Sequence, residues 1–366
     1  MSKAKKDMNM SSAKARELRS NAITFGMVIL AYVIVEVLLQ TGHVNSLMKG
    51  LLVPLCTYSI MAVSLNLVVG ISGELSLGHA GFMCLGAFSS ATWSMLMKGS
   101  DMPELLSFVI AILIGAITAA VFGFLIGIPV LRLKGDYLAI VTLAFGEIIK
   151  NIINALYFGV DSNGPHFSLK DSTALGMEKS GQIIIKGAQG ITGAPKMSTF
   201  TIGVVILLIS LFIVLNLMHS RTGRAIMAIR DNRIAAESIG LNPTRFKLLA
   251  FTISAAIAGV GGVLYAHNLS SLQALPKNFG YNQSIMILVF VVLGGIGNMR
   301  GSVIAAVVLT LLPEMLRSLN DYRMLIYAIF LILMMLFTSA PSWIQMRERI
   351  LLRFRKEQKK DGKEQN

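Results

Sequence analysis

The chain has 366 residues, of which 54% are hydrophobic and only 14% are charged, and its mean hydropathy is +0.67. A soluble domain carries roughly 25% charged residues, so this composition excludes an ordinary soluble protein and predicts a polytopic membrane protein. The net charge of +14 predicts no nucleic-acid partner, because the inside loops of membrane proteins accumulate Lys and Arg.

The apolar residues gather in repeated runs of roughly 17–25 residues, the length that crosses a bilayer core. One run is short and breaks at Gly294–Gly297, so the count is nine spans or ten. We count it as a span, because Lys and Arg then concentrate on one side of the membrane, with both termini cytoplasmic. The predicted spans are 22–39, 51–70, 77–97, 105–130, 137–158, 200–217, 248–266, 284–297, 302–317 and 323–340.

The pattern as a whole predicts an all-α integral membrane protein of about ten transmembrane helices. A cytoplasmic N-terminal tail would occupy 1–21 and the transmembrane domain 22–340. The basic C-terminal tail, 341–366, is interpreted as a solvated cytoplasmic anchor near anionic lipid.

Two Gly-rich segments, Gly70–Gly81 and Gly294–Gly301, interrupt the apolar runs. Irregular backbone at membrane depth is tolerated where it is buried in protein or lines a cavity, and transporters place broken helices at their binding sites. The alternative is an ordinary tight turn on the cytoplasmic side. If the first segment lines or gates a path, its candidate residues are Gly73, Glu74, Ser76, Gly78 and His79.

The fifth apolar run carries a polar stripe that includes Glu147, Lys150 and Asn151. Glu147 and Lys150 are three residues apart, so they can pair on one helix face. Intramembrane charge indicates a functional site, and Glu147 and Asn151 therefore join the candidates for a translocation path. A paired Glu and Lys can also simply hold helices together, and we favour this structural role.

Small residues recur at four-residue steps in two of the runs. Gly115, Ala119, Gly123 and Gly127 share one helix face, and Ala255 and Gly259 repeat the spacing further along the chain. Such spacing lets helix backbones approach closely in lipid, so it predicts close helix packing and says nothing about a substrate.

The segment 159–198 is a long, Gly-rich outside loop with nearly balanced charge. A loop of this length inside a compact protein is usually functional or disordered. We leave both alternatives open, and the functional one is the docking of an extracellular partner.

The loop 219–247 is a basic connector between two apolar runs. Its isoleucines recur at helical steps and Pro243 ends the run, which predicts one or two short amphipathic helices. We expect a partner outside the membrane to bind this loop. The isoleucines are Ile226, Ile229, Ile234 and Ile239, and the basic residues are Arg221, Arg224, Arg230, Arg233, Arg245 and Lys247.

Motifs of enzymes are missing from the sequence. It has no GxxxxGK[ST] nucleotide-binding loop, no HExxH and no GxSxG. His79 has no second His or Cys nearby, so we expect no metal site there. The chain is predicted to be neither an enzyme nor the holder of a cofactor.

Four blocks of sequence resemble the LivM-type permease subunit of branched-chain amino acid ABC importers, in order and over nearly all of residues 50–338. The blocks are Asn66–Phe82, Pro129–Glu147, Gly240–Ala256 and Val291–Gly297. The resemblance implies a type II ABC importer-like fold in the bacterial inner membrane. It departs at Thr192-Gly193-Ala194, where the family usually has Thr-Gly-Gly, and again after Pro341.

The resemblance also implies partners: a second, homologous permease similar to LivH, two cytoplasmic ABC ATPases, an extracytoplasmic solute-binding protein and the lipid bilayer. Branched-chain amino acids are the implied substrates. Other amino acids, or urea and related amides, are alternatives, and so is a secondary carrier that acts without ATPases.

The loop 219–247 would be the segment that couples the permease to the ATPases. The importer signature Glu-Ala-Ala-x-x-x-Gly survives here as Ala235, Ala236 and Gly240, with Ile234 in place of the Glu. The residues implied in coupling are Arg224, Arg230 and Asp231 for polar contacts, and Ile226, Ile229, Ala235, Ala236 and Gly240 for a packed face.

Overall fold

The computed structural model describes residues 2–41, 45–98, 102–133, 135–177, 181–317 and 322–339. The predicted tail 341–366 lies outside these residues. The chain divides into two compact units, Met1–Val307 and Val308–Asn366. The second unit holds the end of α12 and the helix α13 (Arg323–Ser339); everything that follows concerns the first.

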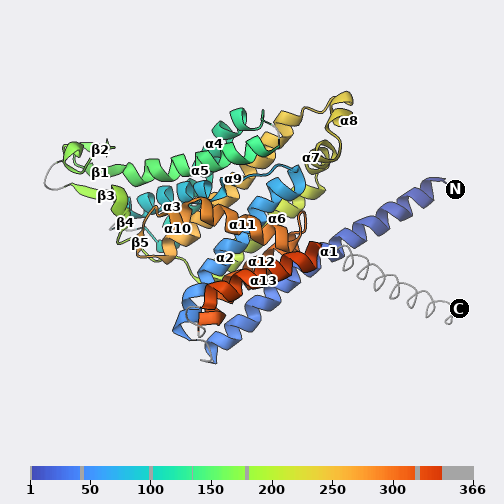
Figure 1. The fold of residues 1–366 in the computed structure, drawn as a ribbon, viewed down its shortest axis with the longest axis horizontal. Helices are drawn as coiled ribbons and strands as arrows, with labels where there is room; N and C mark the ends of the chain where they lie inside the picture. The colour runs from blue at the N-terminus through green and yellow to red at the C-terminus, as the bar shows by residue number, and fades with distance from the viewer. Residues whose placement is uncertain are drawn as a thin grey trace. The chain divides into compact units, whose positions relative to one another are not determined.

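Helices form at each of the predicted apolar runs (Figure 1). Within the described residues, six helical stretches are long and apolar enough to cross a membrane, the longest of them Ser46–Ser72 and Glu104–Val130. The helices at the runs are α1 (Ser2–Gln40), α2 (Ser46–Asn66), α3 (His79–Leu96), α4 (Glu104–Val130), α5 (Asp136–Ala155), α6 (Phe200–His219), α9 (Pro243–Asn268), α11 (Tyr281–Gly294), α12 (Met299–Met315) and α13.

The first helix is longer than the span that it contains. The helix α1 runs without interruption from Ser2 to Gln40, through the predicted tail 1–21 and the first apolar run. Its candidate membrane span is Asn21–Gln40. Leu30 and Val33 on the apolar part of α1 are exposed, as expected of a helix that faces lipid.

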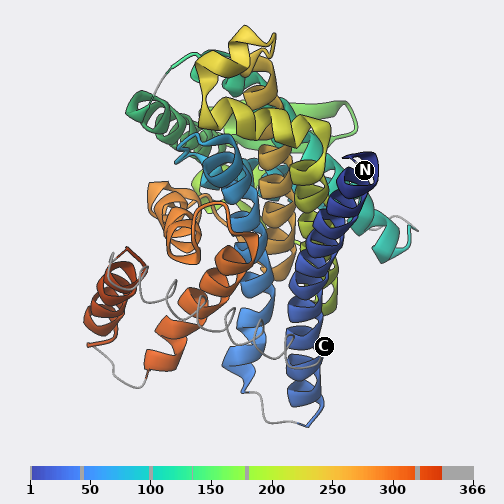
Figure 2. The ribbon, with the colours of Figure 1, turned by 90° about the vertical axis from the view of Figure 1, so that its right-hand side faces the viewer.

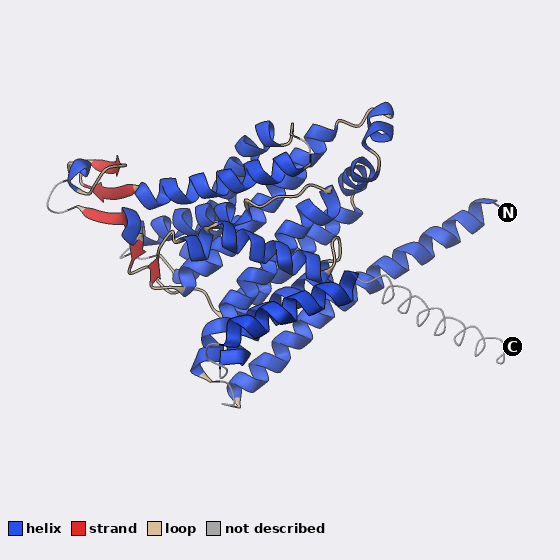
Figure 3. Cartoon of the chain, viewed as in Figure 1, coloured by secondary structure: helices blue, strands red, loops and turns tan. Residues whose placement is uncertain are grey.

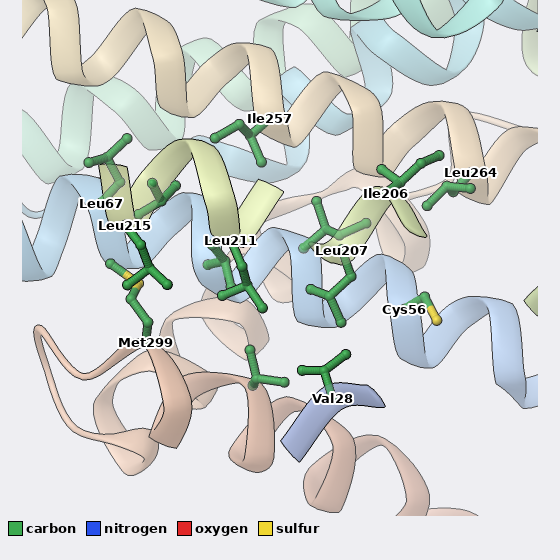
Figure 4. Packing of buried hydrophobic residues seen from close by; sticks show 14 of the residues in the cluster. Val28, Cys56, Leu67, Ile206, Leu207, Leu211, Leu215, Ile257, Leu264 and Met299 are labelled. Carbon is green, nitrogen blue, oxygen red and sulfur yellow. The ribbon is translucent and has the colours of Figure 1, made fainter. Parts of the chain in front are cut away.

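The centre of the first unit is α9, which packs against α2, α3 and α4. The contacts are made through backbone: a Cβ built on Gly259 would lie 2.5 Å from the carbonyl oxygen of Gly115, and one on Gly86 would lie 2.5 Å from the Cα of Gly259. The predicted close packing of small residues is confirmed. Around this contact lies an apolar cluster that includes Leu211 of α6 and Leu264 of α9 (Figure 4).

A small antiparallel sheet lies at one end of the helices (Figure 3). The prediction of an all-α protein is wrong here, because the loop 159–198 contributes four of the five strands. The first hairpin turns at Ser162-Asn163, because Asp161 and Gly164 pair across the turn. The carboxylate of Asp161 accepts from the N–H of Asn163 at 2.8 Å. The strands are β1 (Tyr157–Asp161), β2 (Gly164–Ser168), β3 (Gln182–Lys186), β4 (Ile191–Thr192) and β5 (Ser271–Leu272), in the order β2-β1-β3-β4-β5.

Candidate functional site

Two short helices follow α6 and lie across the ends of longer helices (Figure 2). These are α7 (Arg221–Asp231) and α8 (Arg233–Ser238). Together with Ile239 and Gly240, which follow α8, we call them the helix pair. Each helix begins at a side-chain cap: the Ser220 hydroxyl accepts from the N–H of Gly223, and the Asn232 carbonyl from that of Ala235, both at 3.0 Å. The sequence predicted one or two short helices here, and the structure has two. Pro243 stands in the first turn of α9, where its missing N–H costs nothing.

The isoleucines of the helix pair face in two directions. Ile226 and Ile229 are only 1% and 2% exposed, whereas Ile234 and Ile239 are 81% and 75% exposed. The single apolar stripe expected from spacing is therefore divided, since a break at Asn232 separates α7 from α8. The first half packs inside the chain, and the second half presents apolar surface outside it.

The predicted packed face divides in the same way. Ala236 is buried, but Ala235 and Gly240 are exposed. Gly240 has φ +87°, and no atom lies within 4 Å of a Cβ built on it. Of the five residues predicted to form the packed face, Ile226, Ile229 and Ala236 pack within this chain. Ala235 and Gly240 are exposed.

The arginines of the helix pair differ in what they contact. Nη1 of Arg224 donates to the carbonyl of His219 at 2.9 Å. Nη1 of Arg230 donates to the carbonyl of Gly70 at 2.7 Å, while Nε and Nη2 bind the carboxylate of the exposed Asp231. The sequence predicted Arg230 as a polar contact to a partner. Its side chain is 38% exposed beside Asp231, and within this chain it also contacts Gly70.

The first Gly-rich segment is a broken helix and not a tight turn. The helix α2 passes into a π-helix, η1 (Leu67–Ser72), then Gly73 takes φ +74°, and an irregular stretch runs to Gly78 before α3 begins at His79. We call Leu67–Gly78 the broken segment. The helix α7 lies against η1, so the broken segment and the helix pair belong to one site.

The broken segment is held from a second side by α9. Glu74 forms an ion pair with Lys247 of the first turn of α9, and each side chain is 14% exposed. Lys247 is one of the basic residues of the loop, but its ion pair could not be predicted, because nothing in the sequence indicates which acidic residue it contacts.

The two Gly-rich segments touch one another. Asn66 is fully buried; its Oδ1 accepts from the N–H of Gly297 at 2.8 Å and its Nδ2 donates to the hydroxyl of Ser302 at 2.8 Å. A Cβ built on Gly70 would lie 2.7 Å from the Cα of Gly297. Asn66 was missed as a site residue, although a lone Asn at the end of an apolar run is a signal that could have found it.

The far end of the broken segment is enclosed by α5 and α9. The N–H of Leu77 donates to the Thr142 hydroxyl at 3.0 Å, and a Cβ on Gly78 would collide with the backbone of that threonine. His79 is buried, with Nε2 at 2.8 Å from the hydroxyl of Ser254 and Nδ1 at 3.4 Å from that of Ser76. Among the described residues no group of three His, Cys, Asp or Glu could hold a metal ion.

The candidates on α5 lie at a different contact. Glu147 pairs with Lys150, as the spacing predicts, and its other oxygen accepts from the N–H of Tyr281 at 2.7 Å, at the first residue of α11. A carboxylate suits this position, because the first N–H groups of a helix lack partners and carry positive partial charge. Asn151 is exposed on α5. Glu147 therefore joins α5 to α11, and neither residue contacts the helix pair.

These features define a class of protein: a polytopic helical membrane protein in which a basic helix pair contacts a broken helix. Residues 47–338 match the family described as branched-chain amino acid transport system / permease component. The chain belongs to this family.

Its relatives include the permease proteins LivM of Salmonella typhimurium and of Escherichia coli K12, each 37% identical over 290 residues. The alignments cover 76% of this chain and 66% of each relative, so the chain spans about two thirds of their length. The permease LivH of Salmonella typhimurium is 26% identical over 260 residues, covering 69% of this chain and 79% of LivH. No solved structure matches the chain.

Proposed function

We propose that the chain is the permease subunit of an ATP-driven importer of branched-chain amino acids. The observation that carries the proposal is the helix pair, which presents Ile234 and Ile239 to an outside partner and contacts the broken segment on its inner side. The identity with LivM supports the transport class and the substrate. The chain has no nucleotide-binding loop, so its energy would come from separate ATPases.

In this proposal the chain crosses the bacterial inner membrane about ten times, with both termini cytoplasmic. The shorter helices α3, α11, α12 and α13 would then be spans as well. A second permease similar to LivH would complete the translocation path, and two cytoplasmic ATPases would bind the helix pairs of the two permeases. The sheet β1–β5 would face the other side, where exposed Phe167 and Leu169 offer apolar contacts to a solute-binding protein.

The mechanism would be alternating access. Closure of the ATPases on ATP would displace the helix pair, and the helix pair would move the broken segment to which Arg230 is bound. Selectivity would rest mainly on the solute-binding protein, which delivers the substrate. With a different solute-binding protein, the same permease would carry other amino acids or small amides.

The test replaces by Asp the two exposed isoleucines of the helix pair, one in α8 and one directly after it. Because Ile234 and Ile239 are solvent-exposed in this chain, I234D/I239D should insert and fold normally but lose the ATPases on purification from membranes, together with ATP-dependent uptake of labelled leucine. Leu169→Asp, at an exposed leucine on the sheet side, is the control and should keep the ATPases. Uptake that survives depletion of ATP would instead favour a secondary carrier.

A further inference from the structure

Arg230 joins the helix pair to the broken segment by two kinds of contact. Its Nη1 donates to the carbonyl of Gly70 in η1 at 2.7 Å, a charge-assisted hydrogen bond of the stronger kind. Its aliphatic stem covers Gly73, where a built Cβ would lie only 2.5 Å from Cγ of Arg230. Gly73 also has φ +74°. The broken segment is thus shaped to receive this one side chain.

The ion pair between Glu74 and Lys247 holds the next residue of the broken segment to α9. With both side chains 14% exposed, removing one partner would leave the other charge poorly solvated, which makes breaking such a pair costly. The segment is therefore fixed at Gly70 and Gly73 by α7 and at Glu74 by α9.

The same segment is tied rigidly to the second Gly-rich segment. Gly70 packs on Gly297, and Asn66, one turn before it, binds Gly297 and Ser302. A movement of η1 caused at Arg230 would consequently reach the start of α12 through direct contacts.

We propose that Arg230 and Lys247 are positioning residues that clamp the broken segment and transmit movement of the helix pair to it, and that Arg230 is not a contact to the ATPase. This inference rests on the proposed function, because the movement would originate in ATPases bound to α8. It assigns the exposed isoleucines of the pair to docking and Arg230, through its contacts with Gly70 and Gly73, to transmission.

The first test compares Arg230→Met with Arg132→Met in the complex of permeases and ATPases in proteoliposomes. Arg132 is the matched control, since it is an exposed arginine that follows α4 and belongs to neither the helix pair nor the broken segment. Three quantities are measured: the amount of ATPase that co-purifies, the rate of ATP hydrolysis and the uptake of labelled leucine.

For Arg230→Met we expect normal ATPase binding and continued hydrolysis, with uptake reduced about tenfold or more, the scale of losing a hydrogen bond to a charged group. Arg132→Met should match the wild type in all three. If Arg230→Met sheds the ATPases, Arg230 is a docking residue and the inference is wrong. Unchanged uptake also overturns it. Lack of ATP-driven uptake in the wild type would instead defeat the proposed function.

A charge exchange keeps the inference testable if Arg230→Met fails to insert. Glu74→Lys places two cations together and should abolish uptake, whereas the double variant E74K/K247E restores the ion pair in reverse and should recover most of it. Normal uptake by Glu74→Lys alone, or a double variant no better than the single one, would contradict the clamp.

Discussion

At the scale of single residues, Asn66 connects two separate parts of the chain through one short side chain. It satisfies a backbone N–H in one Gly-rich segment and a hydroxyl in α12, both from a fully buried position. Buried polar groups that lose their partners are expensive because water cannot replace them. One amide therefore holds together two segments that lie far apart in the sequence.

Asn66→Leu should destabilise the protein by about 2–6 kcal/mol, since the part-buried N–H of Gly297 and the buried hydroxyl of Ser302 would each lose a partner at a cost of about 1–3 kcal/mol. The thermal unfolding of the purified protein in detergent measures this loss. Asn151→Leu is the control, because Asn151 is exposed on α5, and its unfolding temperature should stay close to that of the wild type. Equal behaviour of the two variants would contradict the role given to Asn66.

At Gly240 the constraint is the backbone conformation and not the space around the residue. Its φ of +87° strains any β-branched residue, although the space around it is open. Gly240→Val should leave membrane insertion intact but abolish ATP-dependent uptake, since it would re-aim the end of α8. Gly240→Asn should retain uptake, because Asn tolerates the left-handed region. Uptake by the Val variant at the wild-type rate would show that this conformation is unimportant for coupling.

At the scale of elements, α4 and α9 are held by backbone contact. Gly259→Val should separate them, because the new side chain would overlap the carbonyl of Gly115 and Cβ of Ala119; overpacking of this kind costs about 1–3 kcal/mol or more. Size-exclusion chromatography in detergent should show less monodisperse protein. Gly26→Val in α1, where no atom lies within 4 Å of a Cβ, should elute as the wild type does.

Some of the helices and strands could be predicted from the sequence, and others could not. Hydropathy located the helices at the apolar runs, and helical spacing located α7 and α8, because both signals are local. The sheet was missed since its strands are short and one of them, β5, lies in a different connection from the others. The contact of Arg230 with Gly70 could not be predicted, because it depends on which element packs beneath the short helix α7.

At the scale of the whole molecule, the helix pair and the sheet lie at opposite ends of the first unit (Figure 1). Single cysteines at Ile239 and Leu169, both exposed, should therefore react with a membrane-impermeant maleimide from opposite sides. Ile239→Cys should label in inside-out vesicles and Leu169→Cys in intact cells. The natural Cys56 and Cys84 are buried and should contribute little background. Labelling of both positions from one side would contradict the proposed topology.

The sequence predicted the class of the protein more completely than it predicted the candidate functional site. Composition and run length defined a helical membrane protein, and four blocks of residues pointed to the family that residues 47–338 then matched. Of the candidate path residues, Gly73, Glu74, Ser76, Gly78 and His79 do come together in the broken segment and its end. Glu147 and Asn151 do not, because spacing along one helix cannot show which neighbour that helix meets.

The backbone contact of Gly86, Gly115 and Gly259 has a mechanical consequence. Helices that touch through their main chains have no side-chain layer that could repack, and such interfaces do not deform gradually. The helices α3, α4 and α9 should therefore move as one stiff frame. Any change of shape in the first unit must be absorbed where the backbone is already irregular, and the hinge for such a change would be the stretch after η1, from Gly73 to Gly78.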